Sequence, residues 1–357
     1  MDRHELYMGR AIELAKLGAG STGPNPLVGA VLVYKDRVIG EGYHRKYGEG
    51  HAEVNCLRAV GEKDQEFIAV STMYVTLEPC SHYGKTPPCT DLLISKGIKK
   101  VVIGSRDPFP AVNGKGIEKL KTAGIEVSLG LMEKECLELN KRFFTFHTRH
   151  RPYIILKWAQ TADHFISADN SGRLMISNEY TNRLVHKWRS EEMSIMVGTN
   201  TAKTDNPSLT TRSWSGQNPV RLLIDHTLKL PPGLNLFNNE APTIVFNKIK
   251  NEHSGNLRFV KIDKADDNAK APDQDLLNVL KALYDLQITS VIVEGGRKLI
   301  QSFINLGYWD EARVITNPML YVYTGITAPV LKTGSLIETA ESGVDIIQYF
   351  TNSEPWI

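Results

Sequence analysis

The chain has 357 residues, 41% of them hydrophobic and 23% charged, which excludes a mainly disordered polymer and provides apolar material for two folded domains. Its net charge of +2, from 42 basic and 40 acidic residues, argues against a protein that grips nucleic acid over a broad basic surface. Four cysteines are too few for a disulfide scaffold, and neither a secretory signal nor an apolar run of about 18 residues is seen, so we expect a cytoplasmic protein without membrane contact.

Helical and extended patterns alternate through the first part of the chain. Apolar residues that recur every three or four positions predict helices, and short apolar runs between turn residues predict strands. In chain order, the expected helices are 2–17, 52–60, 90–96, 117–123 and 133–146, and the expected strands are 27–34, 38–43, 73–77, 100–104 and 125–129. This order predicts a layered α/β domain with parallel pairing among its later strands.

A polar stretch from Thr148 to Pro152 precedes a second α/β series. Its expected strands are 153–158, 194–198, 220–225, 243–247, 257–262, 290–294 and 311–316, and its expected helices are 178–190, 275–286 and 298–306. The charged run 261–275 is predicted to be a surface loop. We therefore divide the chain into domains at 1–148 and 152–357.

The most specific chemical signal is one histidine followed by two cysteines. His51 precedes Ala52 and Glu53, while Cys80 and Cys89 come after the next predicted strand. Catalytic zinc takes three protein ligands and keeps a fourth position for water. We therefore expect His51, Cys80 and Cys89 to bind Zn²⁺. Glu53, which is not a ligand, would take the water's proton and pass it to the departing nitrogen of a deaminated base.

Other histidines and cysteines in this part of the chain have alternative roles. His82, between the two cysteines, is an alternative fourth ligand that would make the zinc structural, but the three-ligand site is favoured. His44 either lines the site or is a satisfied histidine at a strand end, and the sequence leaves this open. Cys56 and Cys136 lie on apolar helix faces and are expected in the core.

Four segments resemble the deaminase half of the bifunctional riboflavin-biosynthesis deaminase/reductases, the RibD family. They are TGPNPLVGAVLV (22–33), GEGHAEVNCL (48–57), TLEPCSHYGKTPPCTDLL (76–93) and SRDPFPAVNGKGIEKLKTAGIEV (105–127). The resemblance implies a cytidine-deaminase-like domain that deaminates 2,5-diamino-6-(5-phosphoribosylamino)pyrimidin-4(3H)-one with water activated by zinc. It also implies that Asn25 contacts the pyrimidine and Lys85 the phosphate. A lysine is a suitable point charge for phosphate.

The second half is similar, less densely, to the reductase half of the same family, which is related to dihydrofolate reductase. The matching segments are ILKWA (155–159), VGTNTA (197–202), TDNPSLTTR (204–212) and VEGG (293–296). The resemblance implies NADPH as the donor of a hydride to the sugar's C1, which opens ribosyl to ribityl. The residues implied at the cofactor are Ala159, Thr201, Asp205, Gly296, Arg297, Lys298 and Leu299. Those implied at the substrate are Lys157, Arg189, Leu209, Arg212 and Glu294.

Three departures from the family pattern fall in the second half. The family's T-x-D-G stretch reads Thr161-Ala162-Asp163-His164 here, and its S-x-W-I-T-S segment is replaced by RLMISN at 173–178. His226 stands where a small residue is common. These departures affect the cofactor loops rather than the assignment of the domain.

The favoured hypothesis is a bifunctional enzyme that acts on a small phosphorylated pyrimidine, binds no nucleic acid and forms a homo-oligomer. The main alternative is a zinc deaminase of another nucleobase with a non-catalytic nucleotide-binding second half. The set of Lys157, Arg189, Asp205 and Glu294 favours the enzyme, because a sensor would not need all four. An RNA-editing deaminase is disfavoured by the low net charge. A purely structural zinc would have a fourth protein ligand, so the coordination of the metal distinguishes this hypothesis from a catalytic zinc.

Overall fold

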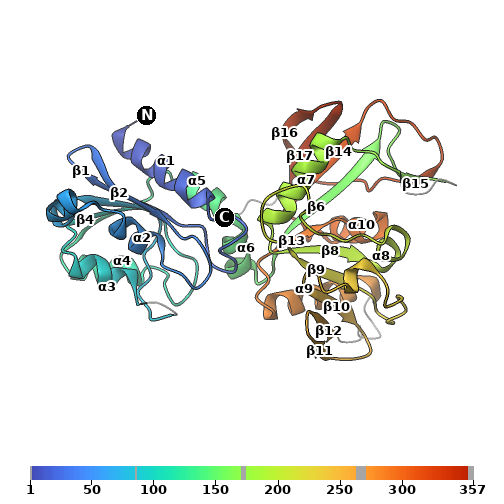
Figure 1. Ribbon diagram of the computed structural model, residues 1–357, viewed down its shortest axis with the longest axis horizontal. Helices are drawn as coiled ribbons and strands as arrows, with labels where there is room; N and C mark the ends of the chain where they lie inside the picture. The colour runs from blue at the N-terminus through green and yellow to red at the C-terminus, as the bar shows by residue number, and fades with distance from the viewer. Residues whose placement is uncertain (1, 85–86, 170–173, 263–270, 353–357) are drawn as a thin grey trace. The chain divides into compact units, whose positions relative to one another are not determined.

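The computed structural model describes residues 2–84, 87–169, 174–262 and 271–352, and the chain divides into two compact units, Met1–Arg149 and His150–Ile357 (Figure 1). Both units are built of helices and β-sheets, so the predicted α/β class is confirmed. Each unit has its own hydrophobic core. Within the described ranges, every helix is too short or too polar to span a membrane.

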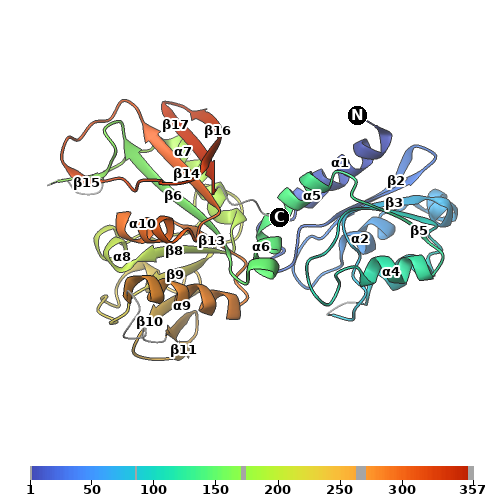
Figure 2. The ribbon, with the colours of Figure 1, turned by 180° about the vertical axis from the view of Figure 1, so that it is seen from behind.

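The first unit is a five-stranded sheet in the order β2-β1-β3-β4-β5 with helices on both faces (Figure 2). Its helices are α1 (Arg3–Lys16), α2 (Ala52–Arg58), the 3-10 helix η1 (Glu62–Val70), α3 (Cys89–Ser95), α4 (Lys115–Thr122), α5 (Glu133–Leu139) and α6 (Lys141–Arg149). Its strands are β1 (Gly29–Tyr34), β2 (Arg37–Tyr43), β3 (Thr72–Leu77), β4 (Lys100–Ser105) and β5 (Glu126–Leu129).

The direction of the strands in this sheet brings candidate site residues to one edge. Strand β1 is antiparallel to β2 and β3, whereas β3, β4 and β5 are mutually parallel, as predicted for the later strands. The carboxyl ends of β3 and β4 therefore lie side by side, and in parallel sheets this edge is where ligands gather. The segment after β3 carries Cys80, and the segment after β4 carries Asp107.

Helix α2 packs directly on the backbone of β2. A Cβ atom added at Gly42 would lie 2.2 Å from the backbone nitrogen of Cys56 and 2.6 Å from the carbonyl oxygen of Ala52. Gly40 is similarly close, 2.7 Å from the carbonyl oxygen of Cys56. Glycine at these positions lets the helix approach the strand closely, and this approach places the start of α2 at the sheet edge.

The second unit is a ten-stranded sheet in the order β11-β12-β10-β9-β8-β13-β6-β14-β17-β16, with a separate pair β15-β7. Its strands are β6 (Tyr153–Thr161), β7 (Phe165–Ala168), β8 (Ser194–Gly198), β9 (Val220–Ile224), β10 (Thr243–Asn247), β11 (Glu252–Ser254), β12 (Leu257–Lys261), β13 (Ser290–Val293), β14 (Glu311–Asn317), β15 (Gly325–Thr327), β16 (Ser335–Ser342) and β17 (Asp345–Thr351). Its helices are α7 (Glu179–Glu191), α8 (Thr199–Asp205), the 3-10 helix η2 (Asn235–Phe237), α9 (Ala271–Asp285) and α10 (Arg297–Leu306). Neighbouring strands from β12 to β14 are all parallel.

Apolar side chains on the two faces of this sheet form separate core clusters. Helices α9 and α10 pack on one face and α7 and α8 on the other. The core includes the buried tryptophans Trp158, Trp188 and Trp309. All five tryptophans of the chain lie in the sequence of this unit.

Several predicted elements differ from the structure. The helix expected at 133–146 is divided into α5 and α6 at Asn140, whose side-chain amide accepts from the backbone nitrogen of Leu27 and donates to its carbonyl oxygen, each at 2.8 Å. The loop expected at 261–275 is wrong at its end, because α9 begins at Ala271; residues 263–270 lie outside the described residues. Helix α8 and the hairpin β16–β17 were not predicted.

Candidate functional site

The histidine and two cysteines of the sequence motif converge at the sheet edge of the first unit. His51 is the N-cap of α2, and Cys89 is the first residue of α3, directly after Pro88. Cys80 lies beyond the end of β3. The three residues therefore lie at two helix starts and beyond a strand end.

The spacing of these three side chains fits a zinc ion. The Nδ1 atom of His51 lies 3.5 Å from the sulfur of Cys80 and 3.3 Å from that of Cys89. All three ligand atoms lie within 4.8 Å of one another. A tetrahedral zinc with Zn–S near 2.3 Å and Zn–N near 2.1 Å holds ligand atoms roughly 3.5–3.8 Å apart. Within the described part of the chain the group has three members, and the exposed His82 packs toward Phe109 instead.

Burial and hydrogen bonding shift the pKa values of the side chains in this cluster. The thiol of Cys89 and, to a lesser degree, His51 donate to Cys80, which lowers the pKa of Cys80. Glu53 is 3% exposed, and its burial, with the nearby charge of Cys80, raises the pKa of its carboxyl. A buried carboxyl whose pKa is raised is suited to accept a proton and release it again.

A chain of hydrogen bonds connects His44 to the candidate substrate residue Asn25. His44 Nδ1 lies 3.2 Å from the carbonyl oxygen of Gly50, so this nitrogen carries the hydrogen and donates. Its Nε2 therefore accepts from the Asn25 amide nitrogen, 3.1 Å away. Burial lowers the pKa of His44, which is consistent with a neutral ring. The Asn25 side chain thus turns its nitrogen toward His44. The ring of His44 lies edge-on to that of His51.

Two acidic residues near this cluster were not singled out from the sequence. Glu78 and Asp107 are 3% and 7% exposed and follow β3 and β4. Burial, together with the charges of Glu78 and Cys80, raises the pKa of Asp107 to about 7. The sequence signal that could have identified them is an acidic residue within two positions of the end of a buried strand. Lys85, expected at the substrate phosphate, lies outside the described residues.

In the second unit, a buried carboxylate joins two of the expected substrate residues. Glu294 accepts from Arg189 at 2.8 and 2.7 Å, and Lys157 Nζ lies 3.5 Å from its Oε2. Burial alone would raise the pKa of Glu294, but the charges of Arg189 and Lys157 outweigh it and lower the pKa to about 2. The structure therefore brings Lys157, Arg189 and Glu294 together as one charged group.

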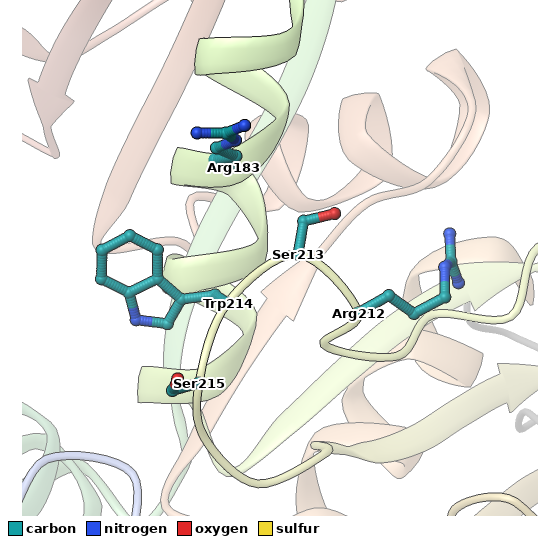
Figure 3. Close-up of a pocket in the computed structure, with 5 residues that line it drawn as sticks. All are labelled: Arg183, Arg212, Ser213, Trp214 and Ser215. Atoms are coloured by element: carbon teal, nitrogen blue, oxygen red, sulfur yellow. The ribbon is translucent and has the colours of Figure 1, made fainter.

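Arg212 extends this group through Thr210. Arg189 donates to the carbonyl oxygen of Thr210 at 3.4 Å, and Arg212 to its hydroxyl at 3.1 Å. Leu209, which precedes Thr210 in the chain, is buried and has a φ of 54°. Arg212 also lines a surface pocket of about 540 Å³ with α7 residue Arg183 and the loop residues Ser213 to Ser215 (Figure 3). This pocket was not predicted from the sequence.

The residues expected at the cofactor come from neighbouring segments of the same sheet. The backbone nitrogen of Gly296 donates to the hydroxyl of Thr201 at 2.9 Å. Gly296 is the N-cap of α10, so Arg297, Lys298 and Leu299 form the first turn of that helix. A helix start after a glycine pair offers backbone N–H groups to phosphate. Ala159 is half-buried in β6, and Asp205 is exposed at the end of α8.

The departures from the family pattern have partial structural explanations. His164 has φ 63°, in the left-handed region that favours glycine, and its Nδ1 lies 3.0 Å from the Gln160 amide nitrogen. In the 173–178 segment, Asn178 is the N-cap of α7, whereas residue 173 lies outside the described residues. His226 Nδ1 lies 3.6 Å from an oxygen of Asp275.

Comparisons with known proteins cover both units. Residues 152–322 match the RibD C-terminal domain, and residues 1–105 match the cytidine and deoxycytidylate deaminase zinc-binding region. The riboflavin biosynthesis protein RibD of Aquifex aeolicus is 43% identical over 316 residues, which cover 88% of this chain and 86% of the relative. A diaminohydroxyphosphoribosylamino-pyrimidine deaminase of Buchnera aphidicola is 54% identical over 142 residues, 40% of this chain and 94% of the relative.

A solved structure agrees with these matches over the whole chain. The diaminohydroxyphosphoribosylaminopyrimidine deaminase/5-amino-6-(5-phosphoribosylamino)uracil reductase of Thermotoga maritima is 35% identical, with a TM-score of 0.87. The match covers 98% of this chain and 99% of that one.

Proposed function

The chain belongs to the RibD family of riboflavin-biosynthesis proteins and is a bifunctional deaminase and reductase, and from this premise we propose which residues carry each reaction. Deamination is assigned to residues 1–148 and reduction to residues 152–357. The observation that carries the proposal is the convergence of His51, Cys80 and Cys89 beside the buried carboxyl of Glu53.

The first proposed reaction is hydrolytic deamination of 2,5-diamino-6-(5-phosphoribosylamino)pyrimidin-4(3H)-one. Zinc, when bound, acidifies a water molecule in its open fourth position. Glu53 takes a proton from the water and delivers it to the 2-amino nitrogen, which leaves as ammonia. The water's other proton goes to the adjacent ring nitrogen as the ring carbon becomes a carbonyl. Asn25 Oδ1 accepts a hydrogen bond from the pyrimidine, and Lys85 pairs with the 5′-phosphate.

The second proposed reaction reduces the ribosyl group of the deaminated product. NADPH, when bound, would supply a hydride to C1 of the sugar. The ring C1–O bond breaks, and its oxygen takes a proton from solvent to become a hydroxyl of the ribityl chain. Thr201, Asp205 and the first turn of α10 bind the cofactor, with Ala159 beside it. Lys157, Leu209 and Glu294 border the substrate. Arg189 and Arg212, which meet at Thr210, provide the positive charge for its phosphate.

The proposal is tested by incubating the full chain with the diaminopyrimidinone ribotide, zinc and NADPH while following ammonia and NADPH together. Ammonia release should precede NADPH oxidation. Glu53→Gln should retain zinc and release no ammonia, because an amide cannot carry the proton. The same variant should still oxidise NADPH when given the deaminated ribotide. Wild-type ammonia release by Glu53→Gln would remove the proton-transfer role from this residue.

We also propose that the chain works in the cytoplasm as a homo-oligomer. Large apolar side chains are exposed at Tyr321, Tyr323 and Ile326 in the second unit, which supports burial of this surface against a second copy. Light scattering of the purified chain tests this, and a monomer at all concentrations would contradict it.

A further inference from the structure

Glu78 is a buried carboxylate that lies two residues before the candidate ligand Cys80. It accepts hydrogen bonds from four backbone N–H groups. One oxygen accepts from Asp107 at 3.3 Å and Gly114 at 2.9 Å. The other accepts from Gly116 at 2.9 Å and Ile117 at 3.2 Å. A carboxylate that accepts several N–H groups forms charge-assisted bonds, which are stronger than neutral ones.

These four donors hold one segment, residues 106–117, which connects β4 to the first turn of α4. This segment contributes groups that lie near the candidate zinc ligands. Asp107 is buried and close enough to Cys80 for the charge of Cys80 to act on its carboxyl. The ring of Phe109 lies 5.9 Å from that of His82, which stands between the two cysteines. Residues 106–117 therefore pack beside the cysteine-bearing segment 78–82.

Backbone contact between the two segments leaves little room for movement. A Cβ atom added at Gly116 would lie 2.1 Å from the carbonyl oxygen of Pro79 and 3.1 Å from an oxygen of Glu78. The start of α4 is therefore pressed against the residue directly before Cys80. Any loosening of the Glu78 bonds would change the distance between segment 106–117 and the metal ligands.

We propose that Glu78 is a positioning residue for deamination, because it holds segment 106–117 at a fixed distance from the cysteine ligands. The substrate would then meet Asp107 and Phe109 in a preset arrangement beside the zinc. This inference rests on the proposed deaminase function. Glutamine cannot replace the carboxylate, because its NH₂ group would face two of the N–H donors.

The test compares Glu78→Gln with Glu118→Gln in the full chain. Glu118 is an exposed carboxylate on α4, so the control makes the same change of charge at the surface. Glu78→Gln should keep its zinc, exchange the amide hydrogens of 106–117 faster, and raise the KM for the ribotide about tenfold or more with a smaller change in kcat. NADPH oxidation on the deaminated ribotide should not change. A purely structural role would lower thermal stability and leave the KM of the folded enzyme unchanged, which would overturn the proposal.

Gly116→Ala tests the same idea from the other segment, in case Glu78→Gln does not fold. The added methyl group must separate α4 from Pro79, so the KM should rise while zinc is retained. A folded Gly116→Ala with a wild-type KM would contradict the proposal. If the wild-type chain releases no ammonia from the ribotide, the deaminase assignment fails. In that case unchanged amide exchange in Glu78→Gln would separately show that Glu78 does not hold the segment.

Discussion

At the scale of single residues, the candidate zinc ligands are distinguished from the other cysteines by their surroundings. Cys89 lies at a helix start beside His51 and Cys80, whereas Cys136 is fully buried on α5, where burial raises the pKa of its thiol to about 12. The pKa of the Cys89 thiol is raised too, by its hydrogen bond to Cys80 and by burial, so what distinguishes Cys89 is that His51 and Cys80 lie beside it. Residue type alone therefore does not identify the ligands, but their convergence in the fold does.

Cys89→Ser should lose most of its zinc, because a hydroxyl is a much weaker zinc ligand than a thiolate. Elemental analysis after gel filtration measures the metal content. Cys136→Ser serves as the matched control and should keep about one zinc per chain. Equal zinc in both variants would exclude Cys89 from the ligand set.

Glu294 is a second residue whose surroundings determine its chemistry, since Arg189 and Lys157 keep it ionised in a buried position. Glu294→Gln removes the carboxylate charge that pairs with Arg189 and Lys157 and should lower the free energy of unfolding by about 3–5 kcal/mol at pH 7. The folded-state pKa of Glu294 is about 2, below the ordinary value near 4.3. Its stabilising effect should therefore be complete above about pH 4.3 and be lost as the pH falls toward 2.

Denaturant unfolding of the wild type and Glu294→Gln at pH 7, 5, 4 and 3 measures this effect. The difference between the two proteins should shrink as the pH falls. Glu341→Gln, at an exposed position of β16, is the control and should match the wild type throughout. A difference that stays constant down to pH 3 would show that the ionisation of Glu294 does not account for the loss.

At the scale of elements, the position of α2 depends on two glycines in β2. The helix carries His51 at its N-cap and Glu53 in its first turn, so a shift of the helix moves both residues. Backbone atoms of the helix fill the space that a side chain at Gly42 would need. Strand and helix therefore position the candidate zinc site together.

Gly42→Ala should displace α2 and weaken zinc binding by about tenfold or more, because the ligand geometry no longer fits a tetrahedral ion. Competition with a chromogenic chelator measures the affinity. Gly9→Ala, in α1 where nothing lies within 4 Å of the added methyl group, is the control and should bind zinc as the wild type does. Wild-type affinity in a folded Gly42→Ala would show that α2 tolerates the shift.

The elements that sequence patterns predicted are those with a regular apolar spacing. Strands β3, β4 and β13 are short apolar runs, and α10 has a clear apolar face, so each was expected near its observed bounds. The break at Asn140 was missed because its cause is a pair of hydrogen bonds to Leu27, far away in the sequence. The hairpin β16–β17 was missed because most side chains of β16 are exposed and give no apolar alternation.

In the candidate site, too, the sequence predicted what depends on local residues and missed what depends on distant contacts. His51, Glu53, Cys80 and Cys89 were identified from residue type and spacing alone. The orientation of the Asn25 amide was not, because it depends on a hydrogen bond from His44 to the carbonyl oxygen of Gly50. The role of Glu78 was likewise hidden, since its partners are backbone N–H groups on another loop. Nearly every residue has a backbone N–H group, so residue types do not reveal which of these groups a side chain will contact.

At the scale of the whole molecule, the two units are built as separate folds. Each has its own sheet and core, and 142 residues of this chain match 94% of the length of the Buchnera aphidicola deaminase. A fragment of residues 1–149 should therefore fold alone, bind about one zinc and release ammonia from the ribotide. Circular dichroism and an ammonia assay measure this. A fragment that stays unfolded with zinc present would show that the first unit depends on the second.

The placement of the tryptophans makes the two units spectroscopically distinct. All five tryptophans occur in the sequence of the second unit, and Trp158, Trp188 and Trp309 are buried in its core. The wavelength of tryptophan emission therefore reports only the unfolding of that unit, whereas far-ultraviolet circular dichroism reports both. Zinc bound by the folded first unit stabilises it by mass action. Chelation should consequently lower the melting temperature of part of the dichroism signal and leave the emission transition where it was, and equal shifts in both signals would reveal that the units unfold together.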